Sequence, residues 1–516
     1  MVIPAKSKER QLDVLFIEPN SSKESYQELA NHYAAIEPST WSLLLAQSCR
    51  SKGFGVAILD ANAERLDEAK ASNRINDLNP RLVCFVCYGQ QPNSGTQQMS
   101  GAIKLCDKLK ELYPAYKTCF VGSHSSALPK EVLVYDSIDF VLYNEGVYAL
   151  HDLLKTNLKT DLHKVGGIGW KENNIGILNG NTKIVPQNMM DHDLPGYAWD
   201  LLPYKNKPFD LYKAHFWHAE FNENYKTPFA ALYTSLGCIK KCSFCMINIL
   251  NRTNLDDNIS AANSPLMRFW SPSFIIKEFD KLMDYGVRTI RISDELFFLN
   301  RRYFEPLLNL IVERGYGNEM RSWSYSRIDT IKVRFLDLFK RAGIKWLATG
   351  IEAASTLVRR EIDKGSFEDI DIRQAIKEIS NAGIYNIGNY IFGFPDDNLQ
   401  TMQQTLDLAC ELNTEMANFY SCEALPGSPL YIQAKQEGWK LPNSFEGYAF
   451  LSYETLPLNT KYCSAEEVLK FRDNAWQTYF TRPIYLNMIE QKFGIQQRKN
   501  IENLSKIKLK RKILGD

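Results

Sequence analysis

The chain reads Ser235-Leu-Gly-Cys-Ile-Lys-Lys-Cys-Ser-Phe-Cys-Met246 at the point that decides its fold. Cys238, Cys242 and Cys245 stand there at a Cys-x3-Cys-x2-Cys spacing. Three thiolates in one short loop can hold three irons of a [4Fe-4S] cluster and leave the fourth iron open. An open iron invites an outside ligand, so this spacing indicates a reaction centre rather than a closed structural site.

Two simpler readings of the triplet are a zinc site and a set of buried unreactive thiols. Structural zinc takes four ligands in paired short spacings, and no fourth Cys or His follows within twenty residues of Cys245. His215 and His218 lie upstream and are the candidates for a missing zinc ligand. We favour the cluster, because the loop follows a strand-like run at 227–234 and is rich in Lys.

Composition describes an ordinary globular protein. The chain has 516 residues, 45% of them hydrophobic and 23% charged, with a formal net charge of +1. This charge gives no reason to expect a nucleic-acid partner. The N-terminus lacks the apolar core of a signal peptide, and no stretch is long enough to span a bilayer. We therefore expect a cytoplasmic protein without a membrane span, and eleven cysteines fit such a reducing compartment.

Short apolar strands alternate with helical runs between residues 12 and 143. This alternation predicts a doubly wound parallel sheet, which binds ligands beyond the carboxyl ends of its strands. Those ends carry Tyr88-Gly-Gln90 and Gly122-Ser-His124, among others. No Gly-x-Gly-x-x-Gly follows the first strand, so a dinucleotide is not indicated. The segment 166–193 reads as a small hairpin joining two domains.

A second strand and helix alternation runs from about residue 227 to 430 and predicts a partial TIM-like barrel. Such barrels carry their chemistry at the carboxyl ends of the strands. Ser293-Asp-Glu295 ends the second predicted strand, Ser326-Arg327 the third, and Gly350-Ile-Glu352 the fourth. Polar side chains thus accumulate at one edge of the barrel, in order after the cysteine triplet.

These motifs together resemble the radical S-adenosylmethionine (SAM) enzymes, whose SAM binds the open iron through its amino and carboxylate groups. The resemblance implies that Glu295 receives the amino group and that Ser326 and Arg327 meet the carboxylate and ribose. It places Glu352 toward the ribose or amino group and Phe244 beside the adenine. A carboxylate suits an ammonium ion, and Arg grips a carboxylate with two parallel hydrogen bonds.

The N-terminal turns resemble the cobalamin-binding domain that precedes the barrel in one large branch of these enzymes. Val121-Gly-Ser-His-Ser-Ser-Ala-Leu-Pro129 is similar to a Gly-Gly-x-His-x-x-x-x-Pro turn, with Ser123 in place of a glycine. Asp139–Gly146 is similar to an Asp-x-Val-x-x-Gly-Glu-Gly segment. The Asp-x-His-x-x-Gly motif that supplies a histidine to cobalt is absent, as is usual in this branch. The resemblance implies cobalamin contacts at Tyr88, Gly89, Gly122, Ser123, His124, Glu145 and Gly146.

The predicted fold class is therefore α/β. We expect a Rossmann-like cobalamin-binding domain at 10–165, a hairpin and linker at 166–225, and a partial (β/α)6 TIM-like radical SAM barrel at 226–435. A mostly helical C-terminal region follows at 436–516.

The resemblance implies a radical mechanism. An electron enters the cluster, SAM is cleaved, and a 5'-deoxyadenosyl radical takes a hydrogen atom from a small-molecule substrate. Methylcobalamin then commonly supplies a methyl group, so we predict a methyltransferase acting on an unactivated carbon or a phosphorus centre. Flavodoxin or ferredoxin is the expected electron donor.

Two alternatives stay open. One is a cyclase or rearrangement enzyme, like the anaerobic magnesium-protoporphyrin ester cyclase. The other is a cluster-bearing redox or binding protein without turnover. The substrate is not readable from the sequence, although Tyr420 and Cys422, after the last predicted strand, are candidates to face it.

Overall fold

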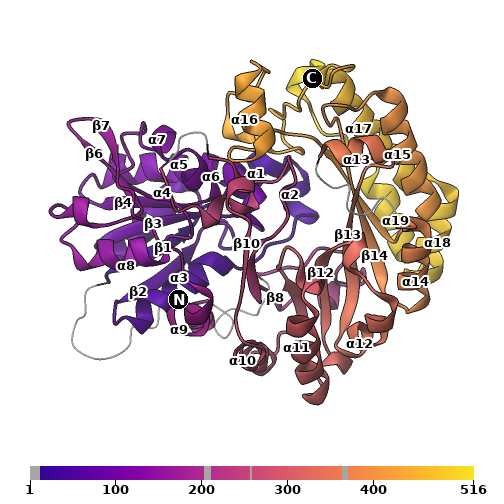
Figure 1. Cartoon of the computed structure of the whole chain (residues 1–516), viewed down its shortest axis with the longest axis horizontal. Helices are drawn as coiled ribbons and strands as arrows, with labels where there is room; N and C mark the ends of the chain where they lie inside the picture. Colours follow the sequence, from indigo (N-terminus) through magenta and orange to yellow (C-terminus); the bar gives the residue numbers. More distant parts are fainter. Residues whose placement is uncertain (1–11, 203–210, 256–258, 363–369) are drawn as a thin grey trace.

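In the computed structural model, residues 12–202, 211–255, 259–362 and 370–516 are described. The chain forms two sheets, one in each half of the molecule, with C-terminal helices packed on the second half (Figure 1). No helix among the described residues combines the length and the apolar composition needed to cross a membrane.

The first sheet has seven strands in the order β2-β1-β3-β4-β5-β6-β7. The first five pair in parallel. Alternate residues of β1 enter different cores: Val14 and Phe16 pack with helices α3 and α8, whereas Leu15 and Ile17 pack with α4 and α5. A sheet buried on both faces needs nearly continuous apolar strands, which this sequence supplies. The predicted doubly wound domain is confirmed. Its strands are β1 (Val14–Glu18), β2 (Val56–Asp60), β3 (Leu82–Cys87), β4 (Lys117–Gly122) and β5 (Phe140–Leu142).

The helices of this half include four long ones and several short ones. The long ones are α3 (Thr40–Ser51), α4 (Glu68–Leu78), α5 (Gly95–Leu112) and α8 (Val147–Lys155). The short ones are α1 (Ser22–Tyr26), α2 (Leu29–His32), α6 (Ser123–Ala127), α7 (Pro129–Val132) and α9 (Met190–Asp193).

The predicted hairpin exists as β6 (Ile168–Glu172) and β7 (Ile175–Leu178), but it does not stand between two domains. Strand β6 pairs antiparallel with β5, so the hairpin extends the first sheet. An unpaired β5 would leave a row of backbone groups exposed at the sheet edge, and the hairpin covers them.

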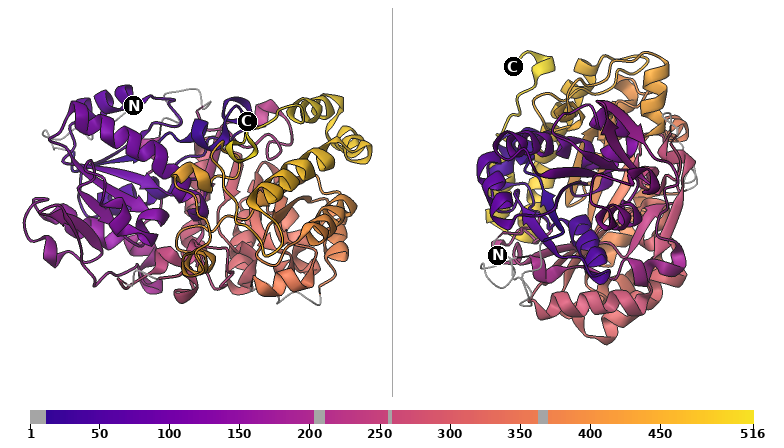
Figure 2. Two further views of the ribbon diagram at one scale, coloured as in Figure 1. Left: turned by 90° about the horizontal axis from the view of Figure 1, so that it is seen from above. Right: turned by 90° about the vertical axis from the view of Figure 1, so that its left-hand side faces the viewer.

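The second sheet has six strands in the order β15-β14-β13-β12-β11-β8. All its neighbours are parallel, as predicted for a partial barrel. Figure 2 shows it facing the first half across the middle of the molecule. Its strands are β8 (Phe229–Leu232), β11 (Thr289–Ile292), β12 (Arg321–Arg327), β13 (Ile344–Glu352), β14 (Tyr385–Phe392) and β15 (Met416–Ser421).

Helices connect these strands, and a short antiparallel ribbon follows β8. The ribbon consists of β9 (Ser235–Cys238) and β10 (Leu266–Phe269). The connecting helices are α10 (Pro272–Asp284), α11 (Arg301–Glu313), α12 (Leu336–Arg341), α13 (Thr356–Glu361), α14 (Ile372–Asn381) and α15 (Leu399–Leu412). The C-terminal helices are α16 (Pro429–Gln436), α17 (Ala465–Thr481), α18 (Pro483–Phe493) and α19 (Ile495–Leu504).

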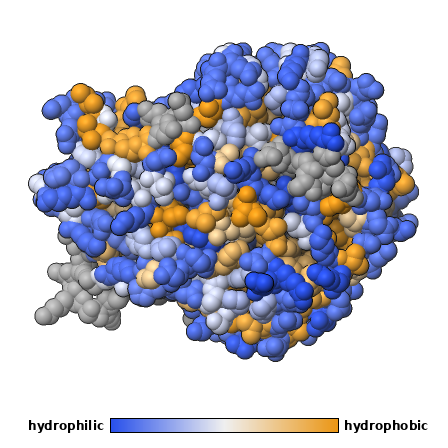
Figure 3. Space-filling view, in the orientation of Figure 1, coloured by the Kyte–Doolittle hydropathy of each residue, from blue (hydrophilic) through white to orange (hydrophobic). Residues whose placement is uncertain are grey.

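Two buried ion pairs join the halves. Arg291 of β11 contacts Glu37 of the first half at 2.7 Å, and Arg268 of β10 contacts Glu145 at 2.7 Å. All four side chains are at most 5% exposed. In the face shown in Figure 3, apolar residues are exposed near the middle of the molecule and in further groups toward its edges. Inside the molecule the halves share one apolar core, in which Trp41 of the first half lies edge-on to Tyr233 of the second, with ring centroids 6.4 Å apart. The halves are therefore held against each other by both charge and apolar contact.

Candidate active site

A cavity of about 270 Å³, the cluster chamber, lies at the carboxyl ends of the barrel strands. Cys238, Cys242 and Cys245 all line it. Chemistry at this edge is what a parallel barrel favours, because each strand hands its last side chains to the same rim. The structure thus brings the predicted cysteine triplet to the predicted end of the sheet.

The ribbon β9–β10 sets the path of the cysteine loop. Gly237 has φ +81°, and a Cβ at this position would lie 2.1 Å from the Leu266 carbonyl oxygen. Only glycine accepts both the left-handed backbone and the close approach. The next residue, Cys238, donates its backbone N–H to Asn248 Oδ1 at 3.0 Å, and Cys245 N bonds Cys242 O at 3.1 Å. The loop is therefore a folded turn rather than a loose connection.

Burial raises the pKa of Cys238 to about 12 and also raises that of Cys245. These thiols consequently need a cationic partner to ionise, as a metal centre provides. Three thiolates in one short loop fit an iron-sulfur cluster, which spreads them over separate irons.

The two histidines that might have completed a zinc site lie elsewhere. His218 is buried with Nε2 3.0 Å from the Arg321 carbonyl oxygen. His215 stacks on Trp217 with ring centroids 5.3 Å apart. Neither lines the cluster chamber.

Two adjacent carboxylates follow β11, and they have different surroundings. Asp294 accepts hydrogen bonds from Thr234 N at 2.6 Å, Thr234 Oγ1 at 2.7 Å and Ser235 Oγ at 2.5 Å. Glu295 lines the chamber, and its buried Oε1 has no hydrogen bond to any described residue. Burial raises the pKa of Glu295 to about 8, against the effect of nearby Arg291. A buried acceptor without a partner fits a ligand that brings its own positive donor, such as the ammonium group of SAM.

Strand β13 ends in a distorted turn that carries Glu352. The pairing with β14 shifts register between Gly350 and Glu352, and Glu352 has φ +64°. Bulges and left-handed non-glycine residues are costly, and both are enriched at functional sites, where they re-aim a side chain. Glu352 lines the cluster chamber.

The remaining predicted SAM residues line the same chamber. Arg327 is held on one side by Asp329, with Nε–Oδ1 at 2.9 Å, and Ser326 Oγ lies 2.8 Å from Thr330 Oγ1. Phe244 packs on Phe394, with ring centroids 5.5 Å apart. Five side chains from four separate segments, predicted one at a time, therefore converge on the cysteine loop.

The residues predicted to contact cobalamin line neither the cluster chamber nor the larger cavity described below. Tyr88 stacks on Trp41 at 4.6 Å, and Glu145 is taken by Arg268. Ser123 Oγ donates to the Pro92 carbonyl at 2.6 Å, and Gly122, with φ +153°, lies tightly against Cys87. These residues make contacts within the protein at the edge of the first sheet. Their contact with cobalamin therefore stays a prediction.

His124 is likewise turned inward. Its ring lies edge-on to Phe445 at 5.1 Å, with Nδ1 3.2 Å from Thr96 Oγ1. Burial lowers its pKa to about 4. The imidazole is therefore neutral and engaged within the protein. Gly89 and Gly146 adopt positive φ angles in turns after β3 and β5.

Sequence reasoning missed the polar side chains that do line the chamber from the first half. Gln91, Ser94 and Gln97 follow β3, just beyond the predicted Tyr88–Gln90 turn, and line the cluster chamber. The side chains of Gln91 and Gln97 make no hydrogen bond to any described residue. Unpaired amides at the carboxyl edge of a doubly wound sheet fit a ligand rich in amide groups, as cobalamin is. The sequence signal that could have identified these residues was the carboxyl end of β3. They follow the predicted Tyr88–Gln90 segment along the chain.

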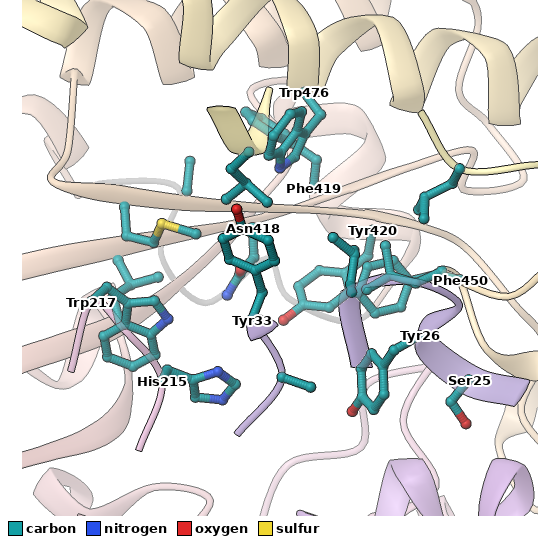
Figure 4. Close-up of a pocket in the computed structure, with 18 of the residues that line it drawn as sticks. Ser25, Tyr26, Tyr33, His215, Trp217, Asn418, Phe419, Tyr420, Phe450 and Trp476 are labelled. Carbon is teal, nitrogen blue, oxygen red and sulfur yellow. The ribbon is translucent and has the colours of Figure 1, made fainter. Parts of the chain in front are cut away.

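A second cavity of about 470 Å³, the aromatic chamber, adjoins the cluster chamber. Gln91, Ser94, Gln97, Tyr325, Ala348, Tyr420 and Phe450 line both. Figure 4 shows Tyr26, Tyr33, Tyr420 and Phe450 gathered in it, with Trp476 above and Trp217 to one side. Tyr420 therefore stands between the chambers, and Cys422 lines the cluster chamber, as expected for substrate-facing candidates.

Fold and site together define an iron-sulfur enzyme whose cluster lies between a barrel and a doubly wound domain. Family models agree: "Radical SAM superfamily" matches residues 232–409, and "B12 binding domain" matches residues 28–154. The chain belongs to the radical SAM enzymes that carry an N-terminal cobalamin-binding domain. Its cofactors are accordingly a [4Fe-4S] cluster, SAM and cobalamin.

Relatives of known sequence span most of the chain. An uncharacterized methyltransferase of Pyrococcus horikoshii is 24% identical over 457 residues, covering 88% of this chain and 90% of the relative. The anaerobic magnesium-protoporphyrin IX monomethyl ester cyclase of Cereibacter sphaeroides is 20% identical over 82% of this chain and 64% of its own length.

Among solved structures, the radical SAM methyltransferase TsrM from Kitasatospora setae, with cobalamin and a [4Fe-4S] cluster bound, superimposes with a TM-score of 0.67. It is 15% identical and covers 96% of this chain and 99% of its own. The cobalamin-dependent radical SAM enzyme OxsB has a TM-score of 0.65 at 14% identity, over 95% of this chain and 72% of its own. At these identities the likeness is one of fold.

Proposed function

We propose that this enzyme is a cobalamin-dependent radical SAM methyltransferase that acts on an unactivated carbon or a phosphorus centre of a small molecule. One observation carries the proposal. The cysteine loop, the predicted SAM residues and the unpaired glutamines of the B12-binding half line one chamber, and that chamber opens onto a second cavity. The cofactors, when bound, supply a 5'-deoxyadenosyl radical and a methyl group.

The protein's own part is binding, orientation and exclusion of water. Cys238, Cys242 and Cys245 hold the cluster and leave one iron open. Glu295 accepts the ammonium group of SAM at its unpartnered Oε1. Arg327, already steadied by Asp329, meets the SAM carboxylate.

The other predicted contacts complete the binding of SAM. Ser326 meets the carboxylate and ribose together with Arg327, Glu352 faces the ribose or the amino group, and Phe244 packs beside the adenine. Both chambers are lined almost entirely by buried or half-buried residues, which strengthens each of these polar contacts.

An external reductant must supply an electron to the cluster, so a flavodoxin or a ferredoxin is part of the proposal. The eleven cysteines are all free thiols, which suits a reducing compartment such as the cytoplasm.

Anaerobic reconstitution with iron, sulfide and hydroxocobalamin tests the proposal. Absorbance spectra report both cofactors, and incubation with a reductant and SAM carrying a labelled methyl group reports turnover. We expect 5'-deoxyadenosine together with a labelled product. Label found only in SAM, cobalamin and the methionine released with 5'-deoxyadenosine would count against methyl transfer.

The second candidate is a ring-closing or rearranging enzyme of the same branch. Its support is the similarity to the magnesium-protoporphyrin ester cyclase over 82% of this chain. In that case 5'-deoxyadenosine forms and the product carries no label. If neither 5'-deoxyadenosine nor product forms with both cofactors loaded, the protein is a redox or binding module instead.

A further inference from the structure

The aromatic chamber has a lining rich in aromatic side chains, with amide, hydroxyl and charged side chains among them. Ten of its lining residues are Phe, Tyr or Trp, contributed by both halves and by the C-terminal region. The ring centroids of Trp217 and Trp323 are 5.2 Å apart, and those of Trp323 and Tyr325 are 5.0 Å apart. The ring centroids of Tyr420 and Phe450 are 4.7 Å apart. Such walls favour a flat apolar body, because aromatic rings pack on flat surfaces and gain little from polar ones.

Three charged side chains line this chamber, and their charges do not cancel. They are Arg472, Asp473 and Lys508. Asp473 Oδ1 accepts from Arg472 Nη1 at 2.8 Å and from Arg511 Nη2 at 2.9 Å, while Oδ2 accepts from Arg511 Nε at 2.9 Å. One carboxylate thus serves two guanidinium groups, and exposed Lys508 makes no ion pair with a described residue. The lining carries a positive excess.

Arg472 is the side chain placed to use that excess. It is 5% exposed, its Nε donates to the Phe419 carbonyl at 2.7 Å, and its Nη1 is taken by Asp473. Nη2 makes no hydrogen bond to any described residue and is not sealed from open space. Arg472 lines the aromatic chamber, and Nη2 is the donor that its guanidinium has left for a ligand there. A buried guanidinium with a free edge is a site for an oxyanion.

The position of Arg472 relates this edge to the cluster chamber. Its Cζ lies 5.3 Å from the Phe450 ring centroid, and Phe450 lines both chambers together with Tyr420. When the anionic group of a ligand pairs with Arg472, the rest of that ligand lies next to the opening toward the SAM residues.

We propose that the aromatic chamber binds the substrate, and that the substrate is a flat, largely apolar compound carrying one oxyanion group, a carboxylate or a phosphate, which pairs with Arg472. This inference rests on the proposed function, because it assigns the substrate of that reaction.

Three fluorescent probes with one ring system test the proposal: 2-naphthoate, 2-naphthyl phosphate and uncharged 2-naphthamide. Each is titrated into the enzyme carrying the cluster, cobalamin and SAM, without reductant. We expect at least one of the two acids to bind at least tenfold more tightly than the amide, and the tighter acid identifies the oxyanion. Equal binding of all three probes overturns the proposal.

Substitution of Arg472 assigns the preference to its side chain. Arg472→Met is expected to reduce the acid preference to less than twofold while amide binding, cluster content and SAM binding stay unchanged, and Arg472→Lys restores part of it. Arg482→Met is the matched control. Arg482, at the end of α17, also donates to a carbonyl and lies over a ring, that of Tyr479, but does not line the chamber. A preference that survives Arg472→Met contradicts the proposal.

A variant of the opposite wall covers the case in which Arg472→Met does not fold. Ile387 lines the aromatic chamber and not the cluster chamber, so Ile387→Phe fills the former alone. We expect it to abolish binding of the acids and of the amide while reductive SAM cleavage continues. If cobalamin loading displaces every probe, the chamber belongs to cobalamin and the proposal fails.

The same experiments separate the two proposals. Acid binding that depends on Arg472, without labelled product from any substrate, refutes methyl transfer alone. Labelled product from a substrate that binds independently of Arg472 refutes the substrate assignment alone.

Discussion

Asp294 and Glu295 are consecutive residues of the same chemical type, yet their different surroundings give them different roles. Asp294 ties the turn after β8 to the end of β11 through Thr234 and Ser235. Glu295 presents an unpartnered oxygen to the cluster chamber. A sequence motif does not show which of two adjacent carboxylates is already satisfied, because this depends on hydrogen bonds across some sixty residues.

Glu295→Gln is expected to weaken SAM binding by roughly 10- to 100-fold, since a hydrogen bond to a charged group contributes about 1.5–3 kcal/mol. Cluster content and stability should be unaffected, because no described residue depends on Oε1. Equilibrium binding of SAM to the reconstituted enzyme measures the effect.

Asp294→Asn serves as the matched control. It should lower the free energy of unfolding by disturbing three internal hydrogen bonds. If Asp294→Asn weakened SAM binding at unchanged stability and Glu295→Gln did not, the assignment would be reversed.

His124 yields a pH prediction. Burial lowers its pKa to about 4 from an unfolded value of about 6.5. The neutral ring therefore contributes stability that is complete above pH 6.5 and is lost as the pH falls toward 4. Between pH 6 and 4.5 the difference in free energy of unfolding between wild type and His124→Gln should narrow by about 1 kcal/mol per pH unit.

Urea unfolding of the full chain at a series of pH values measures this difference. Between pH 7 and 8 the gap should be constant, which is the internal control. A gap that does not change down to pH 4.5 would mean that His124 is protonated in the folded protein.

At the scale of elements, the segment 505–516, the C-terminal strap, has one buried anchor, Arg511, among its contacts. Arg511 is 1% exposed, binds Asp473 with Nε and Nη2, and donates Nη1 to the carbonyls of Phe450 and Ser452. Gln27 of the first half pairs with the backbone of Lys510 in both directions. Ile507, Lys508 and Leu509 line the aromatic chamber, so the strap forms part of its wall.

Arg511→Met is expected to release the strap. It removes four hydrogen bonds and leaves part of a buried charge network uncompensated, which costs about 3–5 kcal/mol. Hydrogen exchange of residues 505–516 should accelerate by two orders of magnitude or more, while exchange in β13 and β14 stays slow.

Lys512→Met is the matched control on the same segment. Its partner Glu454 and Lys512 itself are 36% and 62% exposed, so the change should have little effect on stability. Equal acceleration in both variants would show that Arg511 is not what holds the strap.

Elements were largely predictable from the sequence where local pattern decides them. All six barrel strands and the five parallel strands of the first sheet were expected from short apolar runs bounded by turns. The pairing of the hairpin β6–β7 with β5 was not predicted from the sequence, because strand pairing is a contact between chain segments and leaves no local signal. The strap was missed for the same reason, since its contacts with the first half are likewise made between distant segments.

At the scale of the whole molecule, the buried pair of Glu37 and Arg291 joins the halves beneath the aromatic chamber. Arg291 also lies over the rings of Trp323 and Tyr325, with its Cζ 4.8 Å and 5.3 Å from the two centroids. Removing one partner of such a pair leaves the other charge buried, whereas replacing both with apolar groups need not.

A double-mutant cycle tests this reading. Glu37→Met and Arg291→Met should each lower the free energy of unfolding by about 3–5 kcal/mol, and the double variant should cost less than the sum of these two changes. Glu411→Gln is the control, because its pair with Arg373 is more than half exposed on both sides and should contribute little to stability. Additive single changes would mean that the pair does not couple the halves.

The sequence by itself determined the two sheets, their order along the chain, the cluster cysteines and the five residues proposed to bind SAM. The sheets follow from apolar periodicity and the cluster cysteines from their spacing, which are local properties of the chain, whereas the SAM contacts are implied by the resemblance to radical SAM enzymes. Only the tertiary structure decided that Glu295 is free while Asp294 is occupied, and that Gln91 and Gln97 rather than His124 face the chamber. Only the tertiary structure shows that Arg472, from the C-terminal region, lines a cavity that residues of the first half also line. Each of these outcomes depends on contacts between segments that are far apart in the sequence. Only the packing of the whole chain brings those segments together.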